Sequence, residues 1–292
     1  MTGGQSEHDE QPLALAEPVM LAAFEGWNDA GEAASGALDH LRRAWGAELV
    51  AELDPEEYHD FQVNRPQVSI GDDGRRTITW PTTKVWVATA PVSGRTVLLV
   101  HGIEPSMRWR RYTGEVLDHA ARRGVRTVIT MGALLADVPH TRPIPVSSTT
   151  DDDELLSRLS LERSTYEGPT GIVGVVSEAA AGAGLPSLSL WAAVPHYVGQ
   201  SPSPKAVLAL LGRVEEVLGE PVPLGDLVED ARAWEHGVDE LASEDTEIGE
   251  YVRQLEEAKD TADLPEASGE AIAREFERYL RRRPDEGTPG KV

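Results

Sequence analysis

Short apolar runs bounded by turn residues recur along the first two thirds of the chain. They lie at 19–24, 84–90, 96–101, 127–132, 171–176 and 187–193. Each run is apolar throughout instead of alternating, which is typical of strands covered on both faces. Helical patterns separate several of them, at 30–45, 108–123, 151–161, 177–183 and 204–218. This alternation predicts an α/β fold with three α/β/α layers and a mostly parallel sheet.

The pattern changes in two places. Two short apolar stretches flank Gly71-Asp72-Asp73-Gly74, and the Asp-Gly pair predicts a β-hairpin inserted into the core near residues 67–80. After Pro223 the strand-like runs stop, and amphipathic helices are predicted at 224–243, 245–259 and 268–283. We therefore expect an α/β core over 18–222, a helical C-terminal unit over 223–283, and disordered tails at 1–17 and 284–292.

The three C-terminal helices carry more apolar surface than they can bury among themselves, and monomers seldom leave large apolar patches in water. We expect them to cover the core or a neighbouring subunit in a homo-oligomer, a trimer or a dimer. Trp234 and Phe276 are the predicted anchors of that contact. Trp109 and Tyr112, which follow Arg108 at a predicted helix start, are further interface candidates.

Charge and composition limit the classes of molecule that the chain could bind. The chain has 50 acidic and 27 basic residues among 292, a net charge of −23, which disfavours nucleic acid and anionic membranes as partners. It has no cysteine, no apolar stretch approaching the roughly 20 residues of a membrane span, and no signal-like N-terminus. We expect a cytoplasmic protein whose partners are proteins.

Polar residues follow several predicted strands at one edge of the sheet, where doubly wound folds bind ligands. Asn28 and Asp29 follow the first strand, and His101 and Glu104 follow the third. Asn28 or Asp29 could cap the next helix or could line a pocket for an anion or a carbonyl group. His101 could be a base or a histidine held by the backbone. The sequence leaves these alternatives open.

A second group of candidates lies further along the chain. His140 and Arg142 belong to a proline-braced loop that starts near Asp137, and His196 ends the last predicted strand. The loop resembles a catalytic segment, although Asp137 and Arg142 could simply pair across it. Three histidines from separate strands could meet at a metal, yet their spacing matches no ligand motif. Phosphate-binding, dinucleotide-binding and Gly-x-Ser-x-Gly motifs are missing, so we expect neither a metal ion nor a cofactor.

Several strings together resemble the bacterial branch of the proteasome assembly chaperone family, second-subunit type. They are Phe24-Glu25-Gly26-Trp27-Asn28-Asp29-Ala30-Gly31, Phe61-Gln62-Val63-Asn64-Arg65-Pro66, His101-Gly102-Ile103-Glu104-Pro105, residues 132–143 and Tyr166-Glu167-Gly168-Pro169-Thr170-Gly171. The resemblance implies an α/β/α fold similar to nucleoside phosphorylases and peptidyl hydrolases, a helical C-terminal unit, self-association and a link to proteasome assembly. The chain lacks a terminal hydrophobic-tyrosine-any-residue motif, so docking through that motif is not expected.

Two functions follow from these observations. The favoured one is a non-enzymatic interaction protein that assists assembly of a multi-subunit partner, possible partners including proteasome core subunits. The alternative is an enzyme or small-ligand binder that takes a nucleoside-like or carboxylate ligand at the strand carboxyl edge.

Overall fold

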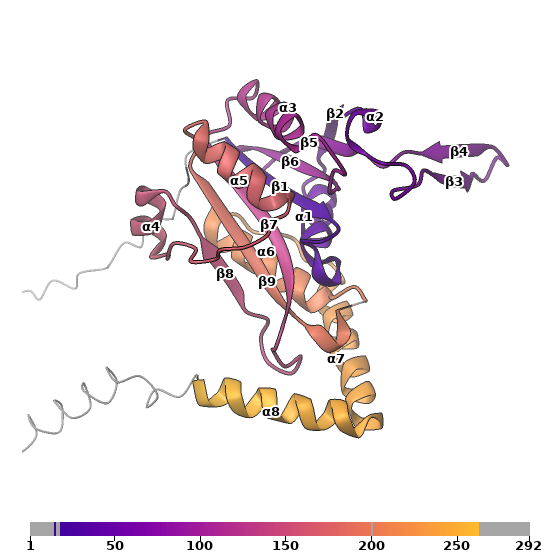
Figure 1. Cartoon of the computed structure of the whole chain (residues 1–292), viewed down its shortest axis with the longest axis vertical. Coiled ribbons are helices and arrows are strands. Elements are labelled where there is room, and N and C mark those ends of the chain that lie inside the picture. The colour runs from indigo at the N-terminus through magenta and orange to yellow at the C-terminus, as the bar shows by residue number, and fades with distance from the viewer. Residues whose placement is uncertain (1–14, 16–17, 200, 263–292) are drawn as a thin grey trace, which may run out of the picture.

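A seven-stranded sheet forms the centre of the computed structural model, which describes Leu15 and residues 18–199 and 201–262 (Figure 1). The strand order is β2 (Glu48–Glu52), β5 (Thr83–Thr89), β6 (Thr96–Ile103), β1 (Val19–Glu25), β7 (Thr127–Ala136), β9 (Ser187–Pro195) and β8 (Val146–Thr149). Strands β2, β6, β1, β7 and β9 point one way, whereas β5 and β8 are antiparallel to their neighbours. The predicted mostly parallel sheet is confirmed.

Helices cover both faces of the sheet, because successive side chains of the central strands point to opposite sides. Leu21 and Val97 join the apolar cluster beneath α1 (Ala33–Ala44) and α6 (Pro204–Leu218). Met20 and Leu98 join the cluster beneath α3 (Trp109–Ala121) and α5 (Ile172–Gly182). These two clusters separate three layers, so the predicted α/β/α architecture is confirmed (Figure 1).

Local signals set the ends of α6. The hydroxyl of Ser203 accepts a hydrogen bond from the N–H of Ala206 (3.4 Å), Pro204 occupies the first turn, and Gly219 ends the helix in the left-handed region. The remaining short elements are the 3-10 turns η1 (Ala30–Glu32) and η2 (His196–Val198) and the helices α2 (Pro55–Tyr58) and α4 (Asp153–Leu159). The predicted helix 30–45 therefore begins as η1 and continues as α1.

One secondary-structure prediction was wrong and two strands were missed. Residues 172–176, predicted as part of a strand over 171–176, form the first turns of α5, in which Ile172, Val173 and Val176 are buried at helical spacing. A short apolar run fits a buried helix as well as a buried strand. The missed strands β2 and β8 are the two edges of the sheet, and with five and four residues they are too short to stand out as apolar runs.

The hairpin β3 (Gln67–Ile70) and β4 (Arg76–Thr79) projects from the body of the molecule (Figure 1). Val68 pairs with Ile78 and Ile70 with Arg76, so these four side chains share one face. The three apolar ones are 50%, 71% and 53% exposed for Val68, Ile70 and Ile78. The hairpin thus carries an uncovered apolar face, which we call the hairpin face.

The C-terminal helices are α7 (Leu227–Glu244), which packs on α6, and α8 (Thr246–Ala262), which packs on α7. Ala231, Val238 and Val252 are buried by this packing. The predicted helix 268–283 with Phe276, the tail 284–292 and almost all of the tail 1–17 lie outside the described residues. Within the described ranges, no helix combines the length and apolarity needed to cross a membrane.

Candidate functional site

The seven predicted ligand-binding residues fall into three groups. Asn28, Asp29 and Glu104 surround the starts of α1 and α5. His101 lies on the α1 side of the sheet, and His140, Arg142 and His196 contact the C-terminal helices. Each group has its own set of partners, so the structure does not gather the seven residues into one site.

Glu104 joins two segments that are far apart in the sequence. Its Oε1 accepts hydrogen bonds from Asn28 Nδ2 (3.1 Å) and from the N–H of Ile172 at the start of α5 (2.8 Å). The carboxylate therefore stabilises an otherwise unpaired N–H at the positive end of that helix. Asn28 in turn accepts from the N–H of Ala133 through its carbonyl oxygen (2.8 Å). The side chains of Asn28 and Glu104 therefore bond to each other, and the two residues hold β7 and the start of α5 in place.

Asp29 caps α1. Its Oδ1 accepts from the N–H groups of Ala34 (2.8 Å) and Ser35 (3.1 Å), which is the capping alternative for this residue. Burial raises the pKa of the Asp29 carboxyl group, because its effect exceeds the opposing effect of the hydrogen bonds from residues 34 and 35. The Asp29 carboxylate thus binds the N–H groups at the start of α1.

His101 lies near the carboxyl end of the strand β6, at the edge predicted for ligands. It pairs in register with Ala23 of β1, and its ring lies beside Trp86 with 6.3 Å between centroids. Its Nε2 is 3.5 Å from Oε1 of Glu25 and makes no hydrogen bond within the described residues. Burial lowers the pKa of His101, so the ring is neutral at pH 7. Glu25, Trp86 and His101 line a cavity of about 750 Å³.

The loop 137–142 follows β7 and contacts the C-terminal helices, and we call it the clamp loop. Arg142 forms a two-pronged ion pair with Asp260 of α8, Nε to Oδ1 at 2.8 Å and Nη2 to Oδ2 at 2.7 Å. This pairing lowers the pKa of the Asp260 carboxyl group. Glu256 of α8 accepts from Thr141, and Tyr251 donates to Asp137 (2.9 Å).

His140 is the buried centre of the clamp loop. Its Nδ1 and its backbone N–H both lie 2.8 Å from the hydroxyl of Tyr197, and its Nε2 is 2.9 Å from Oδ1 of Asp239 on α7. The carbonyl oxygen of His140 accepts from Lys205, which also pairs with Glu235 (2.8 Å). His140 thus links η2, α6 and α7.

His196 lies at the same contact but nearer the solvent. Its Nδ1 is 3.3 Å from Oδ1 of Asp137, and its ring packs edge-on against Tyr197 and Tyr251. The segment that looks most like an enzyme in the sequence therefore holds α7 and α8 against the core. Searched over the described residues, histidine, aspartate and glutamate form no group of three or more able to hold a metal ion.

The interface candidates have different environments. Tyr112 is fully buried, and its hydroxyl bonds to Thr83 Oγ1 (2.7 Å), so it is a core residue and not a surface contact. Trp109 is half-buried and donates to the carbonyl of Pro105 (2.6 Å). Trp234 is half-buried on α7. Phe276 lies outside the described residues.

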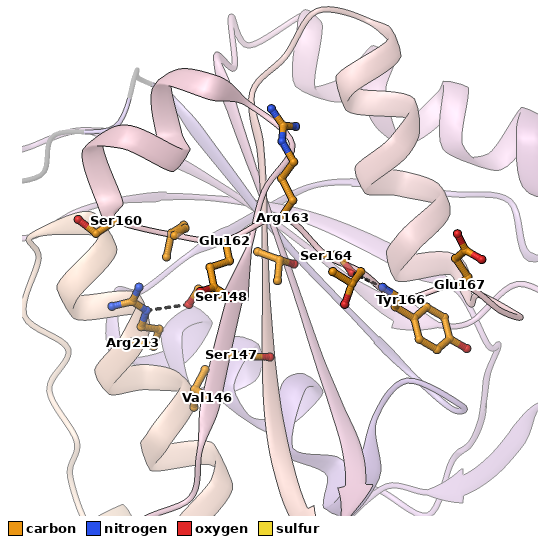
Figure 2. Close-up of a pocket in the computed structure, with 13 residues that line it drawn as sticks. Val146, Ser147, Ser148, Ser160, Glu162, Arg163, Ser164, Tyr166, Glu167 and Arg213 are labelled. Atoms are coloured by element: carbon orange, nitrogen blue, oxygen red, sulfur yellow. Dashed lines mark hydrogen bonds between the residues drawn. The ribbon is translucent and has the colours of Figure 1, made fainter. Parts of the chain in front are cut away.

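A groove of about 830 Å³ beside the edge strand β8 was not predicted (Figure 2). One wall is α6, from which Arg213 donates to the hydroxyl of Ser148 (2.8 Å). The other wall is the segment 160–167, with Arg163 and Tyr166. None of the seven ligand candidates lines this groove. The only sequence signal was the run of hydroxyl residues that forms β8.

Comparisons with known proteins identify relatives over most of the chain. The family model described as the PAC2 family matches residues 23–242. A PAC2 family protein from Streptomyces avermitilis is 56% identical, with a TM-score of 0.76 over 81% of this chain and 100% of that chain. A proteasome-assembly chaperone homologue from Mycobacterium tuberculosis is 48% identical, with a TM-score of 0.74 over 80% of this chain and 100% of that chain.

A third structure, a Mycobacterium tuberculosis protein of unknown function, is 30% identical, with a TM-score of 0.75 over 89% of this chain and 93% of that chain. No curated protein matches the chain at a significant level.

Proposed function

The chain belongs to the PAC2 family, and on that premise we propose that it is a cytoplasmic, non-enzymatic chaperone that assists assembly of a multi-subunit protein, the proteasome core. The relationship to a proteasome-assembly chaperone homologue over that protein's whole length supports the partner. The seven candidate residues lie in three separate places, and those beside α5 and in the clamp loop are engaged in contacts within the fold, which supports a role in binding rather than catalysis.

The hairpin face is the observation that carries the proposal. Val68, Ile70 and Ile78 line one side of a projecting two-stranded hairpin, while Ser69 and Thr77 occupy the other side. An isolated two-stranded hairpin is marginally stable in water, and an apolar face of this kind is typical of a protein contact. We propose that a second copy of the chain covers it in a dimer or trimer.

Light scattering after size exclusion tests the self-association. We expect the wild-type chain to elute as a dimer or trimer at micromolar concentration, and the double variant Val68→Asp, Ile78→Asp to elute as a monomer. The matched control is Ser69→Asp, Thr77→Asp, which places the same charges on the opposite face and should keep the oligomer. A monomeric wild type, or equal effects of both pairs, contradicts this part of the proposal.

The same measurement tests the contacts predicted on the C-terminal helices. Trp234→Ala and Phe276→Ala reduce the oligomer mass if these helices contribute to the interface. If both variants keep the wild-type mass, the helices cover only their own subunit.

Affinity capture tests the partner. A tagged chain expressed at its native level should recover proteasome core subunits above the level of an untagged strain, as measured by quantitative mass spectrometry. Repeated recovery at background level would show that the partner is not the proteasome, while the self-association result would stand independently.

A further inference from the structure

The cavity beside His101 lies where the connections of two neighbouring strands diverge. Strands β1 and β6 are parallel neighbours, with Glu25 opposite Ile103 at their carboxyl ends. The chain leaves β1 for α1 on one face of the sheet and leaves β6 for α3 on the other face (Figure 1). Strand ends that part in this way open a crevice, and doubly wound folds bind ligands there. We call this space the switch-point cavity.

The walls of the switch-point cavity suit a planar apolar group. Trp86 of β5 forms part of its wall and is almost buried, and Trp80, at the root of the hairpin, is 44% exposed. The ring of Trp80 packs against Phe61, with 4.9 Å between centroids, which orients it. The volume of about 750 Å³ falls within the range of small-molecule sites, roughly 300 to 1,000 Å³.

The charged lining favours an anion. The cations Arg42, Arg65 and Lys84 line the cavity together with the acids Glu25 and Asp39, on a chain whose net charge is −23. The guanidinium of Arg42 lies over the Trp86 ring at 5.7 Å from its centroid, so a cation sits directly beside the apolar wall.

Burial shifts the pKa of two groups at the cavity. It lowers the pKa of His101, which is therefore neutral at pH 7. It raises the pKa of Glu25, and the nearby Asp29 and Glu32 add to this effect. Asp39 is paired with Arg42 (2.7 Å) and Arg43 (3.2 Å), and Lys84 pairs only loosely with Glu52, at 3.4 Å near the surface. Among the charged lining residues three are cations and two are acids, so the lining holds one more cation than acids.

We propose that the switch-point cavity binds a small aromatic carboxylate, with its ring against Trp86 and Trp80 and its carboxylate beside Arg42 and Lys84. This site is separate from the hairpin face and from the clamp loop. The proposal does not depend on the chaperone function.

Isothermal titration calorimetry on the full chain tests the proposal with two probes of the same shape. Naphthalene-2-carboxylate should bind with a Kd below about 1 mM, and neutral naphthalene-2-carboxamide should bind at least about tenfold more weakly. The double variant Arg42→Gln, Lys84→Gln should bind the carboxylate about as weakly as the amide. The matched control Arg213→Gln, in the groove beside β8, should bind it as the wild type does.

Three results would overturn the proposal. They are no binding of the carboxylate up to about 10 mM, equal binding of the two probes, and unchanged binding by the double variant. If the double variant melts well below the wild type, Trp80→Ala takes its place, because this side chain is partly exposed and outside the core. Wild-type affinity in Trp80→Ala would then contradict the proposed binding mode.

Discussion

Replacing Tyr197 with phenylalanine removes one oxygen atom from the contact that secures the clamp loop. Burial raises the pKa of Tyr197 to about 12, so the hydroxyl keeps its proton at neutral pH. The hydroxyl accepts from the N–H of His140 and also bonds to Nδ1 of the same residue, both at 2.8 Å. Nε2 of His140 bonds to Oδ1 of Asp239 (2.9 Å). One hydroxyl thus links η2 to α7 through His140.

The expected cost follows from the groups left without a partner. Tyr197→Phe leaves the N–H and Nδ1 of the buried His140 unsatisfied, at about 1 to 3 kcal/mol for each group, or ~2 to 6 kcal/mol together. The ring volume is unchanged, so no cavity contributes. If the loss is local, amides of the clamp loop and α8 should exchange with solvent at least about 30-fold faster.

Hydrogen exchange read by mass spectrometry measures this change, and thermal unfolding shows whether it reaches the whole fold. The matched control is Tyr251→Phe, which deletes a hydroxyl that donates to the exposed Asp137 (2.9 Å) and should cost under about 1 kcal/mol. If Tyr197→Phe accelerates exchange no more than Tyr251→Phe, the hydroxyl of Tyr197 is not what secures the loop.

Three further predictions concern stability. Gly171→Ala should lower the melting temperature strongly, since the new Cβ would lie 1.9 Å from Nδ2 of Asn28. The control Gly182→Ala places its Cβ in open space and should leave the melting temperature unchanged or raise it. Glu104→Ala should cost about 1 to 3 kcal/mol in urea unfolding because two donors lose their acceptor, and Glu104→Gln should cost less. Burial alone would raise the pKa of Glu220, but hydrogen bonds from residues 92 and 93 outweigh it and lower this pKa. The stability that Glu220 contributes is therefore present above its ordinary pKa near 4.5 and is lost as the pH falls through the lower pKa of the folded state. In that acidic window the melting temperature of Glu220→Gln should depend less on pH than that of the wild type.

Much of the fold could be predicted from local patterns. The continuous apolar runs identified the five strands that become β1, β5, β6, β7 and β9, because such strands are covered on both faces whatever their neighbours are. The capping serine, the first-turn proline and the final glycine marked both ends of α6. The family strings also identified the family to which the chain belongs.

Other features depended on partners distant in the sequence. Residues 172–176 are helical where the Glu104 carboxylate, 68 positions away, accepts the first N–H of α5. Tyr112 looked like a surface aromatic beside three arginines, yet its helix turns it into the core against Phe24 and Tyr58. Neither the helix at 172–176 nor the burial of Tyr112 follows from the neighbouring residues in the sequence.

The fold class, the hairpin turn and the family could be predicted before the structure was known, since the apolar runs, the Asp-Gly turn and the family strings are each local patterns along the chain. The roles of the polar candidates depend on contacts that form only when the chain folds. His140 and Arg142 meet α7 and α8 across 99 and 118 positions, and Asn28 meets Glu104 across 76. A local sequence pattern indicates which side of a helix or strand is buried. The hydrogen-bond partner that determines the role of a polar side chain lies on a distant segment, which only folding brings close.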